Sequence, residues 1–327
     1  MEFSGYVNMI KRIINNRLIS PTKVLHSDIS NGLVKIGALR FINSLFAGSK
    51  LGYTAVNKMH LEIIKKLEND YSDIINRYKN YKGNCEYSPN AIVWVAWLQG
   101  YDNAPILVKK CIDSIKKSTS HPVVIITREN VREYSNIPDY VMDKYGKGII
   151  SNAQFSDILR MSLLSEHGGL WIDATIFVPN KIPENVFYNE FYTCKRIPKI
   201  SGYVSQYRWT SFLNGCQKGC IIQKAMADLF FDYWKKNNYL IDYLLVDYFM
   251  LLVYQNIPAA TELIDNLEYN NSQIEELQSR MSLPFAESEY KDLINQEETF
   301  LFKLSWRMKF DLKNNGKDTY YSKFISA

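Results

Sequence analysis

The chain of 327 residues has few cysteines, only a small net charge and no apolar run of membrane-spanning length. A transmembrane helix needs about 20 consecutive apolar residues, and the richest stretch, residues 240–254, is interrupted by Asp242 and Asp247. The sequence therefore predicts that the chain does not cross a membrane. A formal net charge of +5 is too small to indicate nucleic acid as the main partner.

The five cysteines are an odd number, and no charged segment followed by an apolar leader opens the sequence. We therefore expect reduced thiols and a cytoplasmic location. Cys216 and Cys220 lie close together in the sequence, but no His or further Cys with the spacing of a zinc site accompanies them. We expect this pair to pack in the core.

The composition is rich in core-forming residues, with 46% hydrophobic and 14% aromatic side chains. Basic residues gather at the start, where residues 1–90 hold 13 Lys and Arg against 7 Asp and Glu. Helical periodicity interrupted by turn signals predicts a helical N-terminal region over residues 1–88. This region is either a packing appendage or a basic surface that approaches anionic lipid, which would make the protein peripheral at the inner membrane face.

A strand, helix, strand pattern begins after this region. The near-continuous apolar run 91–98 predicts a strand buried on both faces of a sheet. A helix over 105–117 and a short strand over 123–127 follow. Because ligands collect at the carboxyl ends of such strands, Trp97, Gln99 and Gly100 are candidate binding residues.

The segment 151–178 carries the most information. Ser151 or Asn152 can cap a helix that runs to His167, where two glycines stop it. Spacing by three places Asp157 and Arg160 side by side on this helix, where the simplest interpretation is an ion pair.

A strand is predicted over 170–178, with Asp173 and Thr175 on the same side of an extended segment. Both sides of this strand are mostly apolar. A carboxylate placed there is costly to bury without a cation, a donor group or a ligand. Asp173 therefore needs a partner.

Several linked motifs resemble one known family. They are WVAWLQG at 94–100, NAP at 103–105, PDYVMDKYGKG at 138–148, SDILR at 156–160, HGGLWIDAT at 167–175 and LSW at 304–306. Together they resemble the bacterial capsular polysaccharide synthesis proteins, glycosyltransferases of the GT-A, family 32-like class that are similar to retaining mannosyl-type transferases and glucosylating clostridial toxins. The resemblance implies an α/β, Rossmann-like nucleotide-sugar-binding fold with a mixed sheet flanked by helices. It would occupy residues 89–312, between the helical region and a polar tail at 313–327.

The resemblance also implies roles for single residues. Trp97 would stack on uracil beside the turn of Gln99 and Gly100, while Asp157 and Arg160 would contact the donor sugar and diphosphate. The other implied site residues are Asn214 near the donor sugar, the pair Ser305 and Trp306 over the β-phosphate, and Lys303, Arg307 and Lys309 as phosphate-neutralising groups. Some of these residues have a plainer alternative, namely a core aromatic for Trp97, an ion pair for Asp157 with Arg160, a turn residue for Asn214 and solvated cations for the basic residues.

Asp173 matches the first acid of the DXD motif, whose two carboxylates hold a divalent metal in such enzymes. Thr175 stands in place of the second acid. We expect Asp173 and Thr175 to bind Mn²⁺ or Mg²⁺ more weakly than two acids would, with the donor diphosphate supplying the missing charge.

The resemblance implies an enzyme that transfers a hexose or N-acetylhexosamine from a UDP-sugar to a capsule or O-antigen glycan, free or lipid-linked, with retention of configuration. An inverting enzyme would need a carboxylate base, for which Asp247 is the candidate. Two alternatives stay open. Sugar-phosphate or nucleotidyl transfer would normally need a Gly-rich loop that residues 99–101 do not provide, and the missing second acid would suit a non-catalytic scaffold of a polysaccharide assembly complex.

Overall fold

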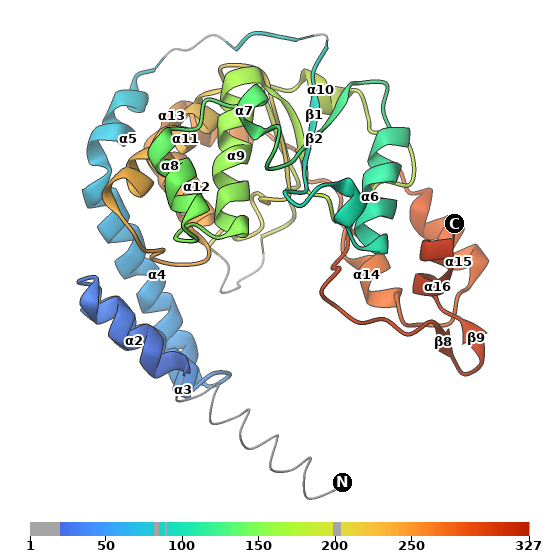
Figure 1. Ribbon diagram of the computed structural model, residues 1–327, viewed down its shortest axis with the longest axis horizontal. Coiled ribbons are helices and arrows are strands. Elements are labelled where there is room, and N and C mark those ends of the chain that lie inside the picture. Colours follow the sequence, from blue (N-terminus) through green and yellow to red (C-terminus); the bar gives the residue numbers. More distant parts are fainter. Residues whose placement is uncertain (1–19, 82–84, 89, 199–203, 327) are drawn as a thin grey trace, which may run out of the picture.

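The computed structural model describes residues 20–81, 85–88, 90–198 and 204–326. Figure 1 shows a central sheet with helices on both faces, an N-terminal helical arm that projects from one side and a small C-terminal group of helices on the other. The α/β fold with a mixed sheet flanked by helices, expected from the sequence, is confirmed. In the described part of the chain, none of the helices has the length and apolar character of a membrane span.

The central sheet has five strands in the order β2, β1, β3, β6, β5. The strands β1 and β3 run parallel to each other, as do β1 and β2, whereas β6 is antiparallel to both β3 and β5. Their bounds are Val93–Ala96 for β1, Val123–Ile126 for β2, Gly169–Ile172 for β3, Phe191–Thr193 for β5 and Leu213–Cys216 for β6.

Each face of the sheet packs against its own helices. Val93 and Val95 of β1 join Leu170 and Ile172 of β3 in one cluster with helix α6, Ile106–Lys117. Trp94 and Trp171 point to the opposite face, into the largest cluster. That cluster includes the helices α7 to α9 and α11 to α13, with bounds Val131–Tyr134, Asp139–Gly146, Asn152–His167, Ile221–Lys236, Leu245–Asn256 and Pro258–Asp265. The strand predicted over 91–98 and the helix predicted over 105–117 are confirmed, with bounds Val93–Ala96 and Ile106–Lys117.

Helix α9 begins and ends where local sequence signals predict. The Ser151 side chain accepts a hydrogen bond from the Gln154 amide, and Gly168 ends the helix at a positive φ of 68°. Gly169 has φ of 95°, and a Cβ atom there would lie only 2.2 Å from the Ile92 carbonyl oxygen. Only glycine fits this contact between the start of β3 and the chain before β1.

The predicted helical N-terminal region is confirmed for residues 20–79, and residues 1–19 lie outside the described residues. Its helices are α2 to α5, with bounds Ser20–Ser30, Val34–Leu45, Lys50–Asp70 and Ser72–Lys79. Ile63, Leu67 and Tyr71 pack into the main cluster, while α2 and α3 extend away from the body (Figure 1). Arg40 connects α3 to the body through Asp242 at 3.2 Å.

The predicted continuous strand over 170–178 is wrong. Strand β3 ends at Ile172, and a turn at Asp173–Thr175 is closed by a 2.9 Å hydrogen bond from the Ile176 amide to the Asp173 carbonyl. The next strand, β4 (Ile176–Phe177), leaves the central sheet and pairs with β7 (Phe302–Lys303). This exchange of partners brings a distant C-terminal segment to the end of β3.

The segment 313–327, whose polar composition suggests a tail, is folded over its described residues 313–326. It forms the hairpin β8–β9 (Lys313–Asn314 and Lys317–Asp318) and helix α16 (Tyr320–Ser326). Tyr320 and Phe324, one helical turn apart, are 3% and 8% exposed and pack in a third cluster. The remaining short helices are η2, α10, α14 and α15, with bounds Tyr101–Asn103, Asn185–Tyr188, Glu276–Arg280 and Glu287–Ile294.

Candidate functional site

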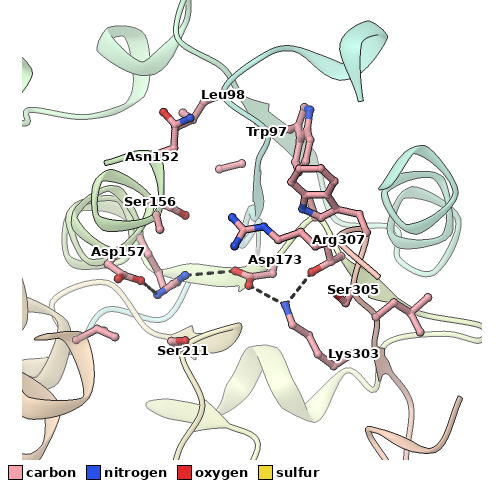
Figure 2. A pocket seen from close by; sticks show the side chains of 18 of the residues that line it. Trp97, Leu98, Asn152, Ser156, Asp157, Asp173, Ser211, Lys303, Ser305 and Arg307 are labelled. Atoms are coloured by element: carbon pink, nitrogen blue, oxygen red, sulfur yellow. Dashed lines mark hydrogen bonds and ion pairs between the residues drawn. The ribbon is translucent and has the colours of Figure 1, made fainter. Parts of the chain in front are cut away.

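A cavity of about 750 Å³ opens where β1 and β3 end (Figure 2). Its walls come from the chain after β1, the first turns of α9, the turn after β3, the start of α12 and the segment after β7. The cavity gathers most of the candidate residues from the sequence, namely Trp97, Gln99, Asp157, Arg160, Asp173, Thr175, Asp247, Lys303, Ser305 and Trp306. Parallel strands that end at one edge explain why these distant segments meet here.

A chain of alternating charges crosses the cavity floor. The Arg160 guanidinium lies 2.8 Å from Asp157 Oδ1 and 3.3 Å from Asp173 Oδ1. Lys303 Nζ donates to Asp173 Oδ2 at 3.1 Å and to Thr175 Oγ1 at 2.7 Å. Figure 2 shows these contacts as one continuous line of dashes from Asp157 through Asp173 to Lys303. Asp173 therefore has two cationic partners, Arg160 and Lys303.

Arg160 is only 3% exposed, and its guanidinium stacks over the Trp171 ring at 4.9 Å. Trp171 also donates its indole N–H to Asp173 Oδ1 at 2.9 Å. The i, i+3 pair predicted between Asp157 and Arg160 is confirmed, but it is not a surface ion pair. Because the Arg160 side chain is shielded from water, its two carboxylate contacts replace hydration and hold the guanidinium in one position.

The three acids of the cavity differ in how easily they ionise. Burial acts to raise the pKa of Asp173, but Lys303 and Arg160 outweigh it and hold that pKa below its usual value. Burial raises the pKa of Asp157 to about 6 in spite of the attraction to Arg160. Burial also raises the pKa of Asp247 to about 6, although the Trp209 indole N–H donates to its carboxylate at 3.0 Å.

Two tryptophans form an aromatic corner of the cavity. The rings of Trp97, just after β1, and Trp306, just after β7, meet edge to face with centroids 5.8 Å apart. The buried Trp97 indole N–H has no hydrogen-bond partner in the described part of the chain. The exposed ring surface of this corner offers a planar ligand aromatic contact.

Three predicted site residues do not line the cavity, namely Gly100, Asn214 and Lys309. Gly100, at φ of 82°, forms the turn after β1, next to Gln99. Asn214 is fully buried behind the wall, where its amide donates to the carbonyls of Thr210 and Ser211 at 2.9 and 3.1 Å. Its contact with a donor sugar stays a prediction. Ser211, to which the Asn214 amide donates, does line the cavity.

Glu275 and Gln278 also line the cavity, although no sequence motif predicted their contribution. The Gln278 side chain accepts a hydrogen bond from the Ser305 amide at 2.8 Å and so positions the segment 304–306. No local signal could reveal this, because Gln278 lies on the short helix α14, far in sequence from the motifs it serves. Asn152, Tyr243 and Met308 are further lining residues outside the motifs, and Ser156 lines the cavity from within the motif 156–160.

Among the described residues, three potential metal-binding side chains come close together at one place, Cys85 with Glu190 and Cys220, which are not part of this cavity. The neighbouring Cys216 packs as expected, with its thiol against the Leu164 carbonyl. At the predicted metal ligands, Asp173 and Thr175, the structure places the Lys303 ammonium. Binding of Mn²⁺ or Mg²⁺ stays a prediction.

A family model described as "Capsular polysaccharide synthesis protein" matches residues 48–324. The chain belongs to the capsular polysaccharide synthesis protein family. The match includes every residue that lines the cavity. No curated protein matches the sequence.

This capsular polysaccharide synthesis protein is also similar to a solved structure titled "PaToxG Glycosyltransferase". The sequence identity is 14%, over 66% of this chain and 84% of that chain, with a TM-score of 0.35. No residue role follows from a similarity so distant. The cavity of this chain itself combines an aromatic corner, fixed cations and acids with unequal pKa values.

Proposed function

We propose that this protein is a GT-A-type glycosyltransferase that moves a hexose or N-acetylhexosamine from a UDP-sugar to a capsule or O-antigen glycan. The observation that supports this most is the order of groups across the cavity. Figure 2 shows Trp97 and Asp157 on opposite sides, with Asp173 and Arg307 between them. A nucleotide sugar presents a base, two phosphates and a sugar in the same order.

In this assignment each group has a defined task. Trp97 stacks on the uracil ring, and Lys303 with Arg307 faces the diphosphate, where charge accumulates as the nucleotide departs. The Asp157 carboxylate accepts hydrogen bonds from donor sugar hydroxyls, held in orientation by Arg160. Positioning the acceptor hydroxyl at the anomeric carbon supplies the remaining rate enhancement.

We propose that transfer retains the configuration of the donor, as the resemblance to retaining enzymes implies. In that mechanism the leaving phosphate takes the proton of the acceptor hydroxyl, and no enzymic base is required. Asp247 lines the cavity and, with its pKa of about 6, could serve as a base near neutral pH. Proton NMR of the glycoside product decides between the two outcomes through its anomeric coupling, because a glycosidic bond does not mutarotate.

A panel of nucleotide sugars tests the proposed function. Specific ligands raise the thermal stability of the folded protein by mass action, so we expect stabilisation by UDP and UDP-hexoses and none by ADP-sugars at equal concentration. Isotope-labelled donor then tests for transfer or slow hydrolysis. A folded protein that responds to none of the nucleotides, with or without Mn²⁺, would reject the assignment.

We further propose that the N-terminal arm, α2 to α4, contacts an anionic membrane where a lipid-linked acceptor lies. The arm combines its basic surplus with large apolar side chains that remain exposed, namely Val24, Ile29, Val34, Phe46, Leu51, Tyr53 and Leu61. Exposed apolar side chains beside lysines suit the boundary between lipid headgroups and acyl chains.

A further inference from the structure

The Lys303 ammonium occupies the position that the sequence pattern assigns to a metal. Lys303 lies on β7, whose backbone is positioned by pairing with β4 and by two hydrogen bonds to sequence-distant residues. Ile176 pairs with Lys303 between β4 and β7, the Leu304 amide donates to the Thr175 carbonyl at 2.9 Å, and the Lys303 amide donates to the Ile274 carbonyl at 2.8 Å. The Lys303 Nζ lies over the Phe212 ring, 5.2 Å from its centroid.

The residues present do not fit a resident divalent metal. Asp173 already accepts from Arg160 and Trp171 on one oxygen and from Lys303 on the other. Thr175 is a neutral hydroxyl that accepts from the same ammonium. Among the described residues, the acids of this cavity do not bring three ligand atoms close together. A divalent cation would gain one carboxylate ligand, and it would either displace Arg160 and Lys303 or be repelled by their charges.

An ammonium group has three N–H donors. Two of those on Lys303 point to Asp173 and Thr175, which leaves one for a ligand in the cavity. Arg307 adds a second cation. Its guanidinium points into the cavity in Figure 2, and it has no carboxylate partner in the described ranges.

We infer that Lys303, held by Asp173 and Thr175 and assisted by Arg307, replaces the divalent metal in binding the donor diphosphate. This inference rests on the proposed function. As the bond between the anomeric carbon and the β-phosphate oxygen breaks, its electron pair goes to that oxygen, and the Lys303 N–H stabilises the resulting charge. The acceptor oxygen forms the new glycosidic bond, and its proton passes to the departing phosphate. Donor binding and transfer then proceed without Mn²⁺ or Mg²⁺.

Calorimetric titration of UDP into the full chain, in EDTA and in Mn²⁺, tests the inference. We expect the same affinity in both buffers. Lys303→Met should weaken UDP binding roughly 10- to 100-fold in EDTA, the size of one lost charge-assisted hydrogen bond, while Lys303→Arg keeps most of it. Lys66→Met, which removes an exposed lysine paired with Asp70 on α4, is the matched control and should leave binding unchanged.

A double variant adds a gain-of-function readout. Thr175→Asp combined with Lys303→Met restores two acids and removes the ammonium, and its UDP binding should become dependent on Mn²⁺. If the unaltered protein binds UDP only with Mn²⁺, or if Lys303→Met binds UDP in EDTA as tightly as the unaltered protein, the inference is wrong and the proposed function stands. If UDP binds in neither buffer, the proposed function itself fails.

Discussion

The Arg160 guanidinium on α9 lies 3.3 Å from the Asp173 carboxylate at the end of β3. The same guanidinium lies 2.8 Å from Asp157. One buried cation therefore connects α9 to the turn at Asp173–Thr175, which follows β3. The donor-facing acids of the proposed site are thereby set at a fixed separation before any ligand arrives. Preorganisation of this kind is what charge stabilisation in a transition state requires.

Arg160→Met should lower the free energy of unfolding by about 3 kcal/mol, because it leaves two partly buried carboxylates, those of Asp157 and Asp173, without their shared cation. Transfer should be lost as well. Denaturant unfolding and a turnover assay measure the two effects separately. Arg132→Met removes an exposed pair with Asp139 and should cost less than about 1 kcal/mol. Equal losses in the two variants would contradict the structural role given to Arg160.

Turnover should increase with pH through about 6, where Asp157 ionises and becomes an acceptor for sugar hydroxyls. The profile is measured as kcat/KM against pH. Asp157→Asn should abolish the dependence together with most of the activity. If Asp247 instead carried the dependence, Asp247→Asn would remove the limb near pH 6, and a base role for Asp247 would be supported.

Stability should respond to Asp247 in a pH-dependent way. Its folded pKa, about 6, lies above the usual value, so the folded state binds the proton more tightly and loses stability as pH rises from about 4 through 6. Asp247→Asn cannot ionise and still presents an oxygen to Trp209. We expect its melting temperature, relative to the unaltered protein, to be higher at pH 8 than at pH 5. The opposite trend would show that the Asp247 carboxylate is stabilised by its surroundings.

Trp97→Ala should weaken UDP binding by about 1 to 3 kcal/mol, the range measured for bases stacked on aromatic side chains. Trp306→Ala should have a smaller effect, because Trp306 is 43% exposed. Calorimetry of the folded variants gives the affinities, and Tyr188→Ala, at an exposed tyrosine outside the cavity, is the control. Unchanged UDP affinity in Trp97→Ala would place the base elsewhere.

Membrane contact of the arm is tested by flotation with anionic and neutral liposomes. Val34 and Leu61 are 58% and 65% exposed and are next in sequence to Lys35 and Glu62, an ion pair that joins α3 to α4. The double substitution of Val34 and Leu61 by Glu should abolish flotation without lowering the melting temperature. Ile197→Glu, at an equally exposed site outside the arm, should leave flotation intact. Flotation that persists in the double variant or that does not weaken with salt would rule out this surface.

Local patterns in the sequence determined the elements that hold the site. The apolar run before Trp97 predicts a strand buried on both faces, and Ser151 with Gly168 marks both ends of α9. The spacing of Asp157 and Arg160 predicts their contact, because residues three apart on a helix are neighbours. Each of these features depends on residues close together in the chain.

The tertiary structure alone decided what Asp173 and Thr175 contact. Alternating apolar residues predict a strand through 170–178, but they do not encode which partner strand each half will choose. The chain turns at residue 173, and β4 then pairs with β7. This pairing brings Lys303 into contact with Thr175, 128 residues away in the sequence. A hydrogen bond over that separation depends on the packing of the whole core, and for this reason the cation opposite Asp173 was visible only in the folded protein.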